Sequence, residues 1–166
     1  MLRVQELMGD EGASRALQAL FSVAQLQLCV HPTDTLLPGS YWGESEAGIT
    51  DRCIHVRPDT PLHSLLHEAC HVLCAGGESR VGFVGDADGD DDEESAVCLM
   101  QIQLAEAVPG VGASRLCEDM DAWGYSFREG SAKAFLRGDG ADAAAWLSQS
   151  RPKAWSLLER FGVAGI

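Results

Sequence analysis

Basic residues are scarce in this sequence. Its 166 residues include 12 Lys and Arg against 25 Asp and Glu, which gives a formal net charge of -13. Binding to nucleic acids or to anionic membranes needs a basic face that neutralises phosphate groups. The composition therefore argues against both partners, and we expect the acidity to keep the protein soluble.

Long apolar runs are missing as well. No stretch reaches the roughly 18 apolar residues that cross a membrane, and residues 1–6 lack the basic and apolar parts of a signal peptide. We therefore expect a cytoplasmic protein. Thiols stay reduced in the cytoplasm, so the cysteines are expected to be small buried residues without disulfides. They are Cys29, Cys53, Cys70, Cys74, Cys98 and Cys117.

The chain has no internal repeat and no linker rich in Ser, Gly or Pro. Its length suits one domain, and a content of 46% hydrophobic residues is enough to build a core. We expect a single domain over residues 1–166, of the α+β class and mainly α. The predicted elements are a helix over 11–28, a strand over 49–57, helices over 61–75 and 92–107, and short helices over 113–122, 130–137, 141–149 and 152–161.

The helix over 61–75 has the clearest boundaries. Thr60 is a suitable N-cap, and Pro61 fits the first helical position because its missing N–H costs nothing there. Gly76 and Gly77 favour a stop, since glycine accepts the left-handed conformation at a helix end. Residues 78–92 are expected to form a loop with a brief strand over 81–84.

The segment His67-Glu68-Ala69-Cys70-His71 lies inside this helix. Residues four apart lie on the same helix face, so His67 and His71 present two imidazoles to one point. Glu68 is displaced by about 100° around the helix, which places its carboxylate beside a bound metal rather than on it. The pattern predicts two metal ligands and one general base.

A third ligand is expected at the start of the helix over 92–107. Glu93 is in line with the apolar stripe of Ala96, Val97, Met100 and Leu104, which should face the core. We therefore favour Glu93 as the ligand. The alternative is Glu94, and both glutamates also suit the positive end of a helix dipole without any metal.

This combination resembles a known group. The H-E-x-x-H segment of residues 67–71, followed by Glu93 with Ala96 three residues later, is similar to the minimal core of gluzincin-type zinc metallopeptidases. The resemblance covers residues 49–107. It implies a small zincin-like core, in which a short β-sheet packs on the H-E-x-x-H helix and further helices follow towards the C-terminus. It also implies a peptide or protein substrate.

The chemistry of that group, carried over, assigns zinc to His67, His71 and Glu93. Such a zinc ion keeps one position for a water molecule and lowers the pKa of that water to about 7. Glu68 accepts the proton as the water attacks a peptide carbonyl, and passes it to the leaving amine. Tyr125 is a candidate donor to the oxyanion, although packing is the more common role for such a residue.

Other polar groups near the motif have simpler interpretations. His63, four residues before His67, is expected to be a supporting group near the metal or a surface histidine. Cys70 and Cys74 share a different helix face and are expected to pack in the core. The acidic run over 86–92 lacks the spacing of a calcium loop and should be solvated.

Two other functions use the same residues. Two histidines and one carboxylate also describe the ligands of non-haem Fe(II) oxygenases, and the layout is similar to the elongation factor P hydroxylase family. The third alternative is a non-catalytic protein whose acidic surface docks a partner. Imidazole and carboxylate suit both metals, so zinc and Fe(II) both stay open, and the sequence leaves the oligomeric state undetermined.

Overall fold

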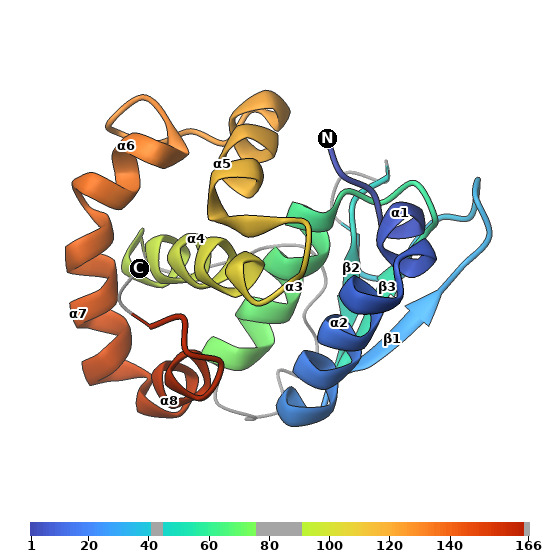
Figure 1. Ribbon diagram of the computed structural model, residues 1–166, viewed down its shortest axis with the longest axis horizontal. Coiled ribbons are helices and arrows are strands. Elements are labelled where there is room, and N and C mark those ends of the chain that lie inside the picture. Colours follow the sequence, from blue (N-terminus) through green and yellow to red (C-terminus); the bar gives the residue numbers. More distant parts are fainter. Residues whose placement is uncertain (41–44, 76–90, 165–166) are drawn as a thin grey trace. The chain divides into compact units, whose positions relative to one another are not determined.

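The structure is a computed structural model that describes residues 1–40, 45–75 and 91–164 (Figure 1). The chain divides into two compact units, which we describe separately. One unit comprises residues 2–88 and the other residues 89–166 together with Met1. The described residues form eight helices and a three-stranded sheet, which confirms the α+β, mainly α class. The predicted glycine stop at 76–77 and the strand over 81–84 lie outside them.

The unit of residues 2–88 holds the sheet. Its elements are α1 (Val4–Gly9), α2 (Glu11–Ala24), β1 (Gln27–Val30), β2 (Gly48–Thr50), β3 (Cys53–Val56) and α3 (Leu62–Cys74). β3 is the central strand, parallel to β1 and antiparallel to β2. α3 packs against β2 and β3, and α2 packs against α1 and β1. The predicted packing of the H-E-x-x-H helix on a short sheet is thereby confirmed.

Two predicted elements of this unit differ from the structure. The helix expected over 11–28 ends at Ala24, and Gln25 caps it in the left-handed conformation with φ of 55°. Leu28, expected on the core-facing stripe, lies on β1 with 37% of its surface exposed. The single strand expected over 49–57 is instead two antiparallel strands, β2 and β3. The turn between them contains Asp51, which has a φ of 54°. At both places the backbone pairs with another strand. The spacing of apolar residues along the sequence does not reveal such pairing.

The first turn of α3 is held by the N-terminal segment. The Leu62 N–H donates to the Leu2 carbonyl, and the Val4 N–H donates to the Thr60 carbonyl, both at 2.9 Å. The predicted capping by Thr60 is replaced, because its hydroxyl accepts from the Arg57 N–H at 2.9 Å and Pro61 takes the N-cap position. Backbone pairing therefore satisfies a donor at the helix start that a side chain was expected to satisfy.

The second unit is entirely helical in its described part. It contains α4 (Asp91–Glu106), α5 (Gly112–Trp123), α6 (Ala132–Arg137), α7 (Gly140–Ser150) and α8 (Pro152–Arg160). α4 packs against α5, α7 and α8. It is buried along most of its length, including the side chains of Gln101 and Gln103. These helices match the predicted ranges within two residues at each end.

The cysteine expectation is wrong for two residues. Cys29 on β1 and Cys53 on β3 form a disulfide, with their Cα atoms 6.2 Å apart. Disulfides are typical of oxidising compartments, whereas the cytoplasmic location expected from the sequence favoured reduced thiols. Cys70, Cys74 and Cys117 are buried, as expected.

Among the described residues, no helix is long and apolar enough to span a membrane.

Candidate metal centre

The histidine pair of α3 is the centre of the predicted site. The Nε2 atoms of His67 and His71 lie 3.0 Å apart, and their rings meet edge to face with centroids 4.6 Å apart. His71 is buried at 6% exposure, while His67 and Glu68 are half-buried. The helical spacing of four therefore aims two imidazole nitrogens at one point, as the sequence predicts.

This separation fits a divalent metal. Zinc binds imidazole nitrogen at about 2.0–2.1 Å, so two nitrogens on a tetrahedral ion are about 3.3 Å apart. The observed 3.0 Å differs from this value by a few tenths of an ångström, which a small rotation of either ring supplies. The same distance is that of a hydrogen bond between the two rings.

The surroundings of the pair on α3 are mostly buried. His63, one turn earlier, is 1% exposed, which excludes the surface position considered for it. Cys70 and Cys74 are fully buried, in agreement with their expected packing role. The Ser64 hydroxyl accepts a hydrogen bond from the Ala47 N–H at 2.9 Å, which ties α3 to the segment that leads into β2. The helix that carries the histidines is thus fixed at its start and along its sheet-facing side.

Glu93 and Glu94 lie in the first turn of α4, in the other unit. Glu93 is 4% exposed, and its Oε2 pairs with the guanidinium of Arg151 at 3.0 Å. Arg151 also lies over the Trp146 ring, 5.0 Å from its centroid. This ion pair gives the buried carboxylate a cationic partner, which offsets part of the cost of its burial. Glu94 is half-buried.

Tyr125 follows α5 in the same unit as Glu93. Its ring stacks on Phe127 with centroids 6.4 Å apart, and Phe127 in turn contacts Phe135 with centroids 5.0 Å apart. The Tyr125 N–H donates to the Met120 carbonyl at 3.1 Å. These contacts give Tyr125 a packing role within its unit, and its role as an oxyanion donor stays a prediction.

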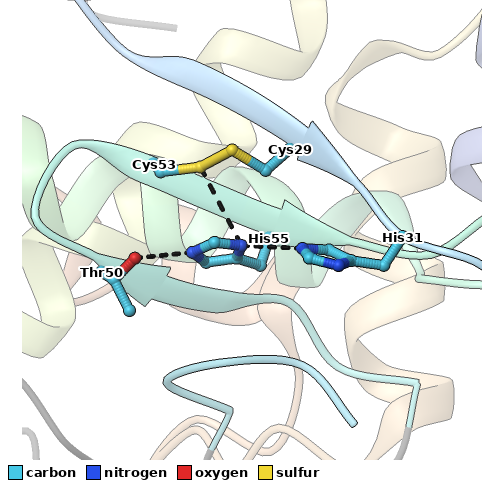
Figure 2. Close-up of a disulfide and its surroundings, with 5 residues drawn as sticks. All are labelled: Cys29, His31, Thr50, Cys53 and His55. Atoms are coloured by element: carbon cyan, nitrogen blue, oxygen red, sulfur yellow. Dashed lines mark hydrogen bonds between the residues drawn. A yellow bond between two sulfur atoms is a disulfide. The ribbon is translucent and has the colours of Figure 1, made fainter. Parts of the chain in front are cut away.

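The structure also brings together a group that sequence reasoning missed (Figure 2). Ligand atoms of Cys29, Cys53 and His55 all lie within 4.8 Å of one another. His31 joins them, because its Nε2 lies 2.9 Å from Nδ1 of His55. Burial, and secondly the nearby His31, lowers the pKa of His55. The signal that could have found this group is a repeated Cys-x-His pattern, at residues 29–31 and 53–55.

Comparison of the chain with family models, with curated proteins and with solved structures finds no match. The site therefore has to be interpreted from its own residues.

Proposed function

We propose that this protein is a small zinc-dependent metallopeptidase whose metal is held by the histidines of α3. The observation that carries the proposal is the 3.0 Å approach of the His67 and His71 Nε2 atoms on a helix fixed against the sheet. Glu68, next to His67, supplies the base that hydrolysis requires. The resemblance to gluzincin-type peptidases supports the choice of zinc and of a peptide substrate.

Each residue of the proposed site has a separate role. His67 and His71 bind the ion, and the sequence pattern adds a glutamate as the third ligand, with Glu93 preferred and Glu94 as the alternative. Bound zinc supplies an acidified water and polarises a carbonyl. Glu68 takes the proton from the attacking water and delivers it to the leaving amine. Arg151 orients the Glu93 carboxylate through their ion pair.

Metal content is the first test. The full chain, purified without chelator and without reductant, is expected to contain one zinc ion per chain by elemental analysis. His67→Ala and His71→Ala should each lose most of it. Iron in place of zinc, in the same histidine-dependent amount, would overturn the peptidase proposal and assign the site to Fe(II) oxygenase chemistry.

Activity is the second test. Hydrolysis of a mixture of internally quenched fluorescent peptides is expected with the zinc-loaded chain. Glu68→Gln should abolish that hydrolysis and leave the zinc content unchanged, because this residue moves a proton and does not bind the ion. A Glu68→Gln chain that hydrolyses the peptides at the wild-type rate contradicts the assignment of the base.

The third ligand is tested by paired substitutions. Glu93→Ala is expected to reduce zinc occupancy more than Glu94→Ala, since Glu93 is the buried carboxylate. Arg151→Ala serves as a control on orientation, because it removes the partner of Glu93 and leaves both carboxylates in place. A greater loss with Glu94→Ala would move the ligand by one residue.

A further inference from the structure

A repeated Cys-x-His pattern places four metal-binding side chains on one face of the β1–β3 pair. Side chains alternate between the two faces of a strand, so the Cys and the His of each pattern point to the same side. In the parallel register Cys29 is the partner of His55, and the His31 N–H continues the pairing by donating to the Val56 carbonyl at 2.7 Å. Figure 2 shows the four side chains gathered on this face.

The opposite face of β3 is apolar. Ile54 and Val56 alternate with Cys53 and His55 and are fully buried. Cys29, His31 and Cys53 are half-buried, which leaves the cluster open to small solutes. The strand thus separates a core face from a face that carries sulfur and imidazole donors.

The orientation of His55 is that of a metal ligand. Its Nε2 lies 2.6 Å from the hydroxyl of Thr50 on β2, while its Nδ1 faces His31 Nε2 at 2.9 Å and Cys53 Sγ at 3.9 Å. Histidines that bind a metal typically donate their other ring N–H to an oxygen, which fixes the tautomer. When the Thr50 hydroxyl accepts from Nε2–H in this way, the Nδ1 lone pair points towards His31 and Cys53.

We propose that Cys29, His31, Cys53 and His55 form a Cys2His2 zinc site once the disulfide between the two cysteines is reduced. Two thiolates and two imidazoles match the ligand set of structural zinc sites. Softer thiolate ligands also favour zinc over magnesium, calcium or manganese. The site is separate from the histidine pair of α3 and uses none of its residues.

The disulfide and the metal compete for the same sulfur atoms. Two molecules of a small thiol can reduce the disulfide: they give up two electrons and two protons, become a disulfide themselves, and leave Cys29 and Cys53 as two thiols. Zinc binding then displaces the two protons, because the thiolate is the form that binds metal. A hydroperoxide reverses the change: it accepts two electrons from the two thiolates and two protons from solvent, its O–O bond breaks to give an alcohol and water, and the zinc ion is released as the S–S bond forms. The site therefore couples zinc release to thiol oxidation.

Cobalt(II) is a suitable probe because sulfur ligation gives it an intense charge-transfer absorption that histidine ligation does not give. The full chain, reduced with a phosphine, should develop this absorption with two equivalents of cobalt, enough for this site and for the histidines of α3, and zinc should abolish it by displacement. The oxidised chain should lack it, even when cobalt occupies the histidines of α3. Absence of the sulfur absorption from the reduced, folded chain would overturn the proposal.

Substitutions locate the site. Cys29→Ser and Cys53→Ser should each abolish the sulfur-to-cobalt absorption, and His31→Ala should weaken cobalt binding at least tenfold. Cys98→Ser is the matched control, since Cys98 is another half-buried cysteine, and it should leave the absorption unchanged. Retention of the absorption in Cys29→Ser, or its loss in Cys98→Ser, contradicts the assignment.

A measurement on the unaltered chain avoids dependence on variants that fold poorly. Zinc added to the reduced protein should slow alkylation of Cys29 and Cys53 by iodoacetamide at least tenfold, as read by peptide mass spectrometry. Chelator should restore the rate. Equal alkylation of these two cysteines with and without zinc would refute the site.

Discussion

Reduction of the Cys29–Cys53 disulfide is expected to lower the free energy of unfolding by a calculable amount. The bridge joins residues that are 24 positions apart. In the chain-entropy treatment, a closed loop of this length removes about 11–12 cal/mol/K from the unfolded ensemble, or about 3.4 kcal/mol at 25 °C. When the bridge is cut, the unfolded chain regains this entropy. The long-range pairing of β1 with β3 must then form without the covalent link.

Zinc should restore most of that loss. At a free concentration one hundred times its dissociation constant, a ligand that binds only the folded state adds about 2.7 kcal/mol. The assay is urea denaturation followed by circular dichroism, on the oxidised chain, the reduced chain with chelator, and the reduced chain with zinc. A double Cys29→Ser, Cys53→Ser variant serves as control, because it removes both sulfur ligands and leaves the histidines of α3 unchanged.

Two results would refute the reasoning. If the reduced chain with chelator is as stable as the oxidised chain, the bridge does not constrain the unfolded state as calculated. If zinc raises the stability of the reduced wild type no more than that of the double serine variant, the cysteines do not bind it.

Three further predictions concern other parts of the molecule. Hydrogen bonds from Arg57 lower the pKa of the Asp59 carboxyl, so Asp59→Asn should cost about 1 kcal/mol near neutral pH. In urea denaturation the full difference in the free energy of unfolding should be present above the ordinary aspartate pKa. It should disappear as the pH falls through the lower pKa that Asp59 has in the folded state. Burial, then Glu94, raises the pKa of Cys98 to about 12, and burial, then Asp121, raises that of Cys117 to about 11. Both thiols should therefore react far more slowly than free cysteine with iodoacetamide at pH 8, and rapid labelling of the folded chain would contradict this. Leu65→Ala, at a fully buried position on α3, should cost about 2–5 kcal/mol by the same denaturation assay, and a loss below 1 kcal/mol would mean that the site repacks.

The helical part of the fold follows closely from local signals. α7 and α8 meet at Pro152, which stands at the first position of α8, and α5 ends where Gly124 adopts φ of 104°. Such signals act within a few residues, so a single sequence carries them. The buried glutamines of α4 did not follow from the sequence, because the apolar stripe predicted only one buried face for a helix that neighbours cover on several sides.

The sheet required information that lies far apart along the chain. The first two residues of β1 were assigned to the preceding helix because Leu28 continues the helical spacing of Ala24. Paired residues of β1 and β3 are 26 positions apart in the sequence. The hydrogen bonds that join the two strands involve backbone groups present at every residue. Strand pairing is therefore weakly encoded in local sequence, and so is the contact between Cys29 and Cys53.

For the histidine pair, the sequence alone was sufficient. A spacing of four residues inside a helix places His67 and His71 on one face whatever the helix packs against, because helical geometry is local. For the Cys-x-His clusters, the sequence determined only that each Cys and His share a strand face. The tertiary structure decided that the two strands are neighbours, and the long-range pairing of β1 with β3 is what converts two separate pairs of ligands into one group of four.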